Sequence, residues 1–250
     1  MTVTRDGRRA YIGCRGGSIL VFDLENWKEL GKWPEHEGCV LTLKVSEDGS
    51  RLVSGGNDGV LRVWDTVTGK VLNRFRITNG GESWIHDLTI SPNGKRVAYV
   101  SMLANGMKTE KQKLSQLRIL DAASGEVVDS YAAAVGAFDR VQFLGSETAY
   151  AHTTFDGQLI LWDASSSTPV GKFDGHYKGN LSLSASPDGK RLLTLDESGT
   201  ARLWDVSAQQ QLREFVVGSD LQYFPTTSFS ANGDYGILNI KGHVRVVKLP

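Results

Sequence analysis

The feature that most constrains the fold of this chain is a repeat of about 42 residues. Apolar segments that end in aspartate recur, and successive aspartates are separated by 42, 56, 42 and 42 residues. These aspartates are Asp23, Asp65, Asp121, Asp163 and Asp205. An aromatic residue follows each of them by ten positions, at Trp33, Phe75, Tyr131, Phe173 and Phe215. Two markers with the same spacing indicate a repeated structural unit.

Each unit carries the signals of a small antiparallel sheet. Asp-Gly and Asn-Gly pairs recur in SEDGSR, SPNGKR, SPDGKR and SANGDY, and such pairs favour tight hairpins because they tolerate positive φ. Short alternating runs such as LTLKV and LRVW flank these turns. A single sheet of about 40 residues leaves an apolar face in water, so the units must stack. Circular stacking predicts an all-β propeller in which six four-stranded antiparallel blades are visible.

The chain resembles the WD-repeat (Trp-Asp repeat) β-propeller family over nearly its full length. The resemblance is carried by GGNDGVLRVWD, TTFDGQLILWD and SPDGKRLLTLDESGTARLWD. It implies one domain over 1–250, with blades near 1–33, 34–75, 76–131, 132–173, 174–215 and 216–250. The sixth unit is a degenerate copy, because Val247 and Lys248 stand in the places of Trp and Asp.

The first and last blades are expected to be incomplete. Aligning MTVTRDG with LKVSEDG places Met1 inside the innermost strand of the first unit, and the chain stops after the third strand of the sixth. Rings in the family often have seven blades and usually take one outer strand from the N-terminus. We therefore expect either an N-terminally shortened piece of a larger propeller or an unusual six-bladed ring.

The resemblance also assigns a hydrogen-bonded network within the blades. In the family, a histidine, a hydroxyl residue, an aspartate and a tryptophan form a chain, and the matching residues in the second unit are His36, Ser54, Asp58 and Trp64. Such buried groups must satisfy one another, because unpaired polar burial is costly.

Only part of this network is present in two other units. The fifth keeps the histidine, hydroxyl and tryptophan positions as His176, Thr194 and Trp204, with Ser198 replacing the aspartate. The fourth keeps Asp156 and Trp162, with His152 at the hydroxyl position.

Several kinds of chemistry are disfavoured by the motifs that are missing. A serine hydrolase of the nucleophile-elbow type needs a GxSxG segment, and a nucleotide-binding loop needs its glycines and lysine; the sequence has neither. The five histidines lie on different units, and Cys14 and Cys39 lack the paired spacing of a zinc site. No catalytic residue, metal or cofactor is predicted, although ligands from several blades can converge on a central channel.

Charge and hydropathy limit the partners and the compartment. Lysine plus arginine equals aspartate plus glutamate, at 28 each, so no general field favours nucleic acid or anionic membranes. The chain has no apolar run of the roughly 20 residues that cross a bilayer and no apolar signal-peptide core at its start. The expected location is cytoplasmic.

The resemblance implies a rim where partners dock, formed by the loops between blades and the turns between second and third strands. The interblade positions are Trp84, His86, Asp139, Tyr223 and Pro225. The turn positions are Arg15, Asn57, Phe155 and Glu197. Their aromatics are either interface anchors or caps on the core of their own blades.

The third unit is 14 residues longer than the others, and most of the extra residues fall in the segment MLANGMKTEKQKLS, which contributes Lys108, Lys111 and Lys113. It is either a solvated excursion or a further contact element on the same rim.

The resulting functional hypothesis is a non-catalytic scaffold that presents several loops to protein or peptide partners in a larger assembly. Two alternatives stay open: an enzyme, or a binder of a small ligand or metal in the central channel, and a regulatory propeller of a longer signalling protein.

Overall fold

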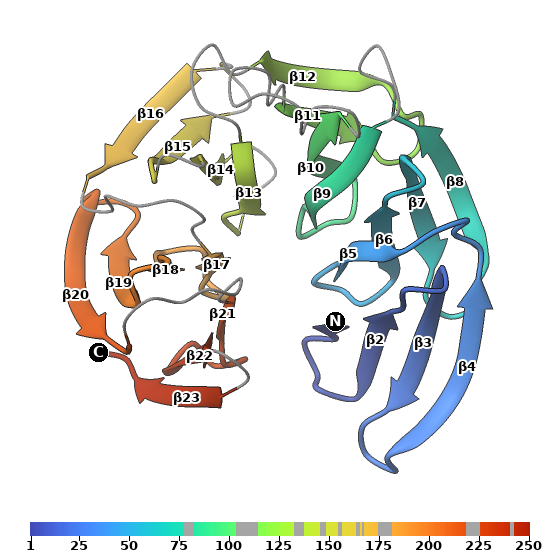
Figure 1. The fold of residues 1–250 in the computed structure, drawn as a ribbon, viewed down its shortest axis with the longest axis horizontal. Coiled ribbons are helices and arrows are strands. Elements are labelled where there is room, and N and C mark those ends of the chain that lie inside the picture. Colours follow the sequence, from blue (N-terminus) through green and yellow to red (C-terminus); the bar gives the residue numbers. More distant parts are fainter. Residues whose placement is uncertain are drawn as a thin grey trace. The chain divides into compact units, whose positions relative to one another are not determined.

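The computed structural model describes residues 1–77, 83–103, 115–132, 138–145, 149–154, 157–163, 166, 168–174, 182–218, 226–240 and 243–250. Their regular secondary structure is entirely β-strand, which agrees with the predicted all-β class (Figure 1). The chain divides into two compact units, Met1–Val135 (unit 1) and Gly136–Pro250 (unit 2).

Unit 1 contains three antiparallel four-stranded sheets. The first has the order β1 (Thr2–Val3), β2 (Arg9–Gly13), β3 (Ser18–Asp23) and β4 (Lys28–Pro34). The second has β5 (Val40–Val45), β6 (Arg51–Gly56), β7 (Val60–Asp65) and β8 (Val71–Arg76). The third has β9 (Ser83–Ile90), β10 (Arg96–Leu103), β11 (Ser115–Asp121) and β12 (Val127–Ala132). The innermost strand of the first sheet is thus only two residues long.

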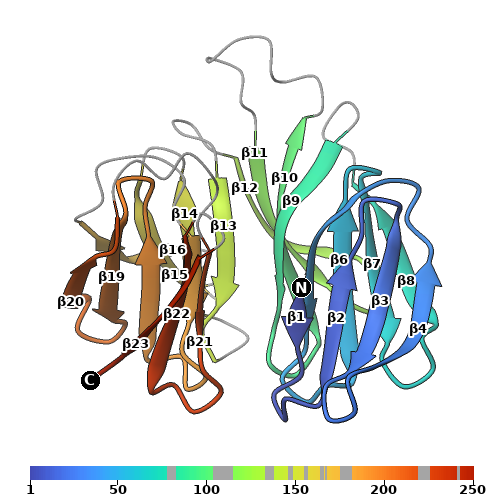
Figure 2. The ribbon, with the colours of Figure 1, turned by 60° about the horizontal axis from the view of Figure 1, so that its bottom comes forward.

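Unit 2 continues the same pattern. Its first sheet has β13 (Phe138–Phe143), β14 (Ala149–Thr154), β15 (Leu159–Asp163) and β16 (Thr168–Phe173). Its second has β17 (Ser182–Ala185), β18 (Arg191–Leu195), β19 (Thr200–Asp205) and β20 (Gln210–Val216). Its third has, among the described residues, only β21 (Thr226–Phe229), β22 (Tyr235–Ile240) and β23 (His243–Lys248). Within each unit the sheets stand side by side with their strands along a common direction (Figure 2).

These sheets are the six predicted blades, three in each unit, and the prediction of a three-stranded last blade is confirmed for the residues that the structure describes. None of those residues belongs to a helix long and apolar enough to span a membrane.

A recurring polar turn joins the first and second strands in the second, third, fifth and sixth blades. In the second blade, the Ser46 hydroxyl donates to Asp48 Oδ1 at 2.6 Å, and the backbone N–H of Arg51 donates to the Ser46 hydroxyl at 3.0 Å. Gly49 completes this turn with a φ of +72°, a conformation that costs glycine little. The equivalent hydroxyl-to-side-chain bonds are Ser91–Asn93, Ser186–Asp188 and Ser230–Asn232.

The core lies between neighbouring sheets and follows the two-residue alternation of the strands. In β6, Leu52 packs toward the first blade, whereas its neighbour Val53 packs toward the third. In β18, Leu192 and Leu193 likewise belong to different clusters, one on each face of the sheet. Each inner blade is therefore apolar on both faces, which explains why its strands read as nearly continuous hydrophobic runs.

Candidate functional site

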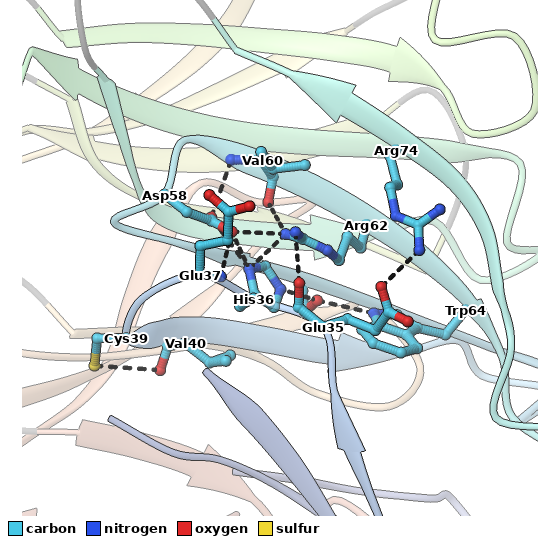
Figure 3. Close-up of polar contacts among 11 residues, drawn as sticks. Glu35, His36, Glu37, Cys39, Val40, Asp58, Val60, Arg62, Trp64 and Arg74 are labelled. Carbon is cyan, nitrogen blue, oxygen red and sulfur yellow. Dashed lines mark hydrogen bonds and ion pairs between the residues drawn. The ribbon is translucent and has the colours of Figure 1, made fainter. Parts of the chain in front are cut away.

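The second blade brings together all four residues of the predicted polar network (Figure 3). His36 lies between β4 and β5, Ser54 in β6, Asp58 in the turn before β7, and Trp64 in β7. His36 Nε2 is 2.7 Å from the Ser54 Oγ, and its Nδ1 is 3.0 Å from Asp58 Oδ2. The Trp64 indole N–H donates to the same Ser54 oxygen at 2.9 Å.

Only part of this chain has a fixed direction. An indole N–H can only donate and an ionised carboxylate can only accept. Ser54 therefore accepts from Trp64, and the His36 ring bridges Ser54 and Asp58. His36 Nδ1 is also 2.7 Å from Arg62 Nη1, and which ring nitrogen donates depends on the tautomer of the imidazole.

Arg62 in β7 is a fifth member that the sequence reasoning missed. Its Nη1 donates to Asp58 Oδ2 at 2.8 Å, and its Nη2 donates to the Glu35 carbonyl oxygen at 2.8 Å. The Arg62 and Asp58 side chains are each only 6% exposed. A signal was present, because arginine interrupts the apolar third strand in LRVWD, LRILD and ARLWD.

Opposing effects act on the carboxyl group of Asp58. Burial alone would raise its pKa, because an apolar environment disfavours the charged form. The hydrogen bond and the charge of His36 outweigh that effect, and the Val60 N–H and Arg62 add to them. The net result is a pKa for Asp58 well below its ordinary value, so the group is a carboxylate near neutral pH.

The arrangement works as a clamp. Asp58 also accepts the Glu37 backbone N–H at 3.3 Å and the Val60 N–H at 3.1 Å, so one carboxylate joins the segment before β5 to the turn before β7. The His36 backbone N–H donates to the Gly17 carbonyl oxygen at 3.0 Å, which connects this clamp to the first blade.

The fifth blade keeps part of the network. The Trp204 indole N–H donates to the Thr194 Oγ1 at 2.9 Å, and both side chains are buried. Asp196, two residues before the position of the missing aspartate, takes its place. It is buried, it accepts a hydrogen bond from the Ser198 hydroxyl, and its Oδ2 lies 3.4 Å from Arg202 Nη1. The sequence register did not reveal this substitution. His176 lies outside the described residues.

The fourth blade shows less of its predicted network. Trp162 is half-buried in β15, where it pairs with Tyr150 of β14. Asp156 and the side chain of His152 lie outside the described part of the chain.

Four of the predicted rim residues lie in unit 1. Arg15, between β2 and β3, and Asn57, between β6 and β7, are exposed. Trp84 and His86 are partly exposed near the start of β9.

Backbone contacts make this edge of unit 1 continuous. The Val40 N–H donates to the Cys14 carbonyl oxygen at 3.1 Å, and the Asn57 N–H donates to the Cys39 carbonyl oxygen at 3.2 Å. The α-carbon of Gly59 lies so close to the Ser83 carbonyl oxygen that a Cβ there would come within 2.5 Å of it. We call the edge formed by residues 14–17, 35–39, 57–59 and 83–86 the unit 1 rim.

One rim prediction in unit 2 is wrong. Asp139 was expected on an exposed loop, but it lies in β13 with no exposed surface and pairs with Arg140 at 3.0 Å. The reason is that β13 begins at Phe138, so the position belongs to a strand rather than to the preceding loop. Glu197 is half-buried. The remaining predicted contacts, Phe155, Tyr223, Pro225, Lys108, Lys111 and Lys113, lie outside the described residues.

Within the described residues, no group of three or more histidine, cysteine, aspartate or glutamate side chains is arranged to hold a metal ion. Cys14 and Cys39 are both free thiols.

Comparison with known proteins agrees with the repeats and the network. A family model for the WD domain, G-beta repeat, matches residues 27–65 and 167–205, which end at the Asp65 and Asp205 markers. These two segments of the chain are WD repeats of that family. The two matched segments include the tryptophans of the second and fifth blades, where the WD-repeat network is best preserved.

Relatives of this WD-repeat chain are distant in sequence. Actin-interacting protein 1 of Drosophila melanogaster is 26% identical over 247 residues, covering 84% of this chain and 40% of that protein. Subunit I of eukaryotic translation initiation factor 3 from Bombyx mori is 25% identical, covering 84% of this chain and 63% of that protein. WD repeat-containing protein 1 of Xenopus tropicalis is 21% identical, covering 84% and 41%. The chain thus spans between 40% and 63% of the length of these relatives.

Proposed function

We propose that this WD-repeat chain is a non-catalytic scaffold that binds a protein or peptide partner on the unit 1 rim. The observation that carries the proposal is the position of Trp84, partly exposed at the edge that also presents Arg15 and Asn57. Tryptophan and arginine dominate the energetics of protein interfaces. Glu37 is exposed on the same edge, so the rim offers both charges around one aromatic side chain.

The clamp in the second blade supports such a rim. Because the carboxylate of Asp58 accepts the Glu37 backbone N–H, the network holds the segment that displays the Glu37 side chain. A rim fixed in this way loses little conformational freedom when a partner binds, and this preorganisation favours affinity.

The geometry argues against a hydrolase that uses Ser54, His36 and Asp58. Ser54 has no exposed surface, and its oxygen already accepts the Trp64 indole N–H. A nucleophile needs access to a substrate carbonyl and a set of oxyanion donors. We therefore assign these residues to blade stability rather than to catalysis.

The names of the relatives are consistent with a scaffold. One is an actin-interacting protein, and another is a subunit of a multisubunit translation initiation factor. These names describe interactions and assembly for those proteins. For this chain they support protein binding as a class of function.

The proposal is tested with the chain as bait in extracts of its native source. Trp84→Ala and Arg15→Ala are compared with wild type and with Trp27→Ala, a matched control. Trp27 is 83% exposed in the turn between β3 and β4, at the opposite end of β3 from Arg15. Proteins that both rim variants lose and the control keeps are then purified, and their dissociation constants are measured directly.

We expect the rim variants to weaken a reconstituted complex by roughly tenfold or more, as for hot-spot residues. The control should stay within about twofold. Equal binding by wild type and both rim variants would refute the assignment of the partner to the unit 1 rim.

A further inference from the structure

A cleft of about 330 Å³ lies between the second and third blades of unit 1. One side comes from the end of β8 and the residue after it, through Arg74, Phe75, Arg76 and Ile77, and the other comes from β10 to β12 of the next blade. The lining residues on the third blade are Tyr99, Arg118, Leu120, Gly125 and Val127.

The register of the strands shows that the cleft lies at the position in the third blade that the polar network occupies in the second. In the second blade, Ser54 pairs with Arg62 across β6 and β7. In the third, Tyr99 pairs with Arg118 across β10 and β11 in the same relative position. The tyrosine therefore occupies the place of the network hydroxyl.

The tryptophan of the network is also replaced. Leu52 pairs with Trp64 in the second blade, and Val97 pairs with Leu120 in the third. Leucine is smaller than tryptophan and has no N–H, so the exchange leaves space and removes the donor that the hydroxyl would otherwise bind. The cleft is the consequence of this exchange.

Tyr99 is left with an unused hydroxyl. The side chain has no exposed surface, and its hydroxyl forms no hydrogen bond with any described residue. Burial raises the pKa of Tyr99, and the nearby Arg118 guanidinium opposes that shift through its charge and through hydrogen bonding to the ionised phenol. A buried, unsatisfied hydroxyl costs about 1–3 kcal/mol, which a ligand acceptor would recover.

Arg118 also lacks the partner that its counterparts Arg62 and Arg202 have. Arg62 pairs with the carboxylate of Asp58 at 2.8 Å, and Arg202 pairs with that of Asp196 at 3.4 Å. Arg118 forms no ion pair with a residue in the part of the chain that the structure describes. The cleft thus has the Arg118 guanidinium and the Tyr99 phenol as donors, and Arg74 and Arg76 also line it; Arg74 pairs with Glu35 at 2.6 Å. None of its lining residues supplies the acidic group that the sister blades have at this place.

We propose that this cleft binds a carboxylate, held by the Arg118 guanidinium and the Tyr99 hydroxyl, with Phe75 and Ile77 against the carbon chain that carries it. Arginine matches a carboxylate through two parallel hydrogen bonds. The sister blades place a carboxylate beside the equivalent arginine, which favours a carboxylate at this position. The inference is independent of the unit 1 rim, because it uses none of its residues.

The test follows Tyr99 by NMR in protein that carries ¹³C-labelled tyrosine, with Tyr99→Phe to assign the signal. The probes are the α-amide of N-acetylglutamate, glutarate, the α-amide of N-acetylglutamine and inorganic phosphate. We expect both carboxylates to shift the Tyr99 signal saturably, and the neutral glutamine analogue to leave it unchanged. Tighter binding of the first probe identifies an acidic side chain as the source, and tighter binding of glutarate identifies a small free acid.

Arg118→Gln should weaken binding of the carboxylate probes by roughly tenfold or more, because a charge-assisted pair is lost. Arg245→Gln is the matched control. It removes the same charge from β23 of unit 2, where Arg245 is exposed and does not line the cleft. The control should change the affinity by less than about twofold.

Equal binding of the glutamine analogue, tighter binding of phosphate, or equal losses in Arg118→Gln and Arg245→Gln would overturn the proposal. If Arg118→Gln fails to fold by circular dichroism, Leu120→Trp provides a second test. It restores the tryptophan of the sister blades and fills the cleft, so carboxylate binding should disappear. Retained binding in that variant would place the carboxylate elsewhere.

Discussion

Replacing Asp58 with asparagine should destabilise the second blade by about 3–5 kcal/mol, the range observed when one partner of a buried ion pair is removed. The substitution keeps the size of the side chain and removes its charge. It leaves the guanidinium of Arg62, only 6% exposed, without a counter-charge. Asparagine can still accept some of the N–H groups that Asp58 binds, which places the expected loss toward the lower end of the range.

A double-mutant cycle separates the ion pair from the rest of the network. Arg62→Met removes the buried charge and keeps an apolar stem of similar shape, so the double variant contains neither charge. If the pair dominates, the double variant should be more stable than the sum of the two single losses predicts, by roughly 1–3 kcal/mol.

Urea unfolding, followed by tryptophan fluorescence and far-ultraviolet circular dichroism, gives the free energies for this cycle. The urea dependence should be the same in all four proteins, so that midpoint shifts report stability. A loss below about 1 kcal/mol for Asp58→Asn, together with additive single effects, would show that the Arg62–Asp58 pair contributes little and that the clamp is held by packing alone.

Three further outcomes are expected. The pKa of Asp58 is lower in the folded chain than its unfolded value of about 3.9. The ionised Asp58 carboxylate therefore stabilises the folded chain fully above that pH, and this stabilisation is lost as the pH falls below it. Between pH 6 and pH 3, the free energy of unfolding should decrease more in wild type than in Asp58→Asn. Thr194→Val should cost about 1–3 kcal/mol in urea unfolding because the buried Trp204 N–H loses its acceptor, whereas Thr194→Ser, which keeps the hydroxyl, should cost less. Trp204→Ala should lower the free energy of unfolding by about 3–5 kcal/mol because the side chain is buried, but Trp84→Ala should lower it by only about 1 kcal/mol or less. A large loss of thermal stability in Trp84→Ala would assign Trp84 to the core.

Much of the polar network could be predicted because the resemblance to the WD-repeat family names its members and the repeat gives their register. His36, Ser54, Asp58 and Trp64 were matched to the network of that family, and they lie within hydrogen-bond distance. Arg62 was missed because an arginine in a strand sequence is ordinarily read as a solvent-facing residue. Only the folded structure shows that its guanidinium is buried against Asp58 and the Glu35 carbonyl oxygen.

The sequence predicts the site least well where a strand begins or where a residue at a different position takes over a role in the network. Asp139 was assigned to a loop because strand ends are poorly marked in sequence, and the structure buries it in β13. Asp196 stands in for the aspartate of the fifth blade from two residues away, which no fixed register can anticipate.

The sequence by itself determined the number of blades, their four-strand pattern and the family, because a 42-residue period with matching turn residues admits few other folds. Tertiary structure alone decided which polar groups found partners. Tyr99 and Arg118 lack the partners that their counterparts Ser54 and Arg62 find in Trp64 and Asp58, and only the packing of the second blade against the third shows that a cleft is left beside them. Burial makes the difference matter, since an unmet donor costs free energy only where water cannot reach it.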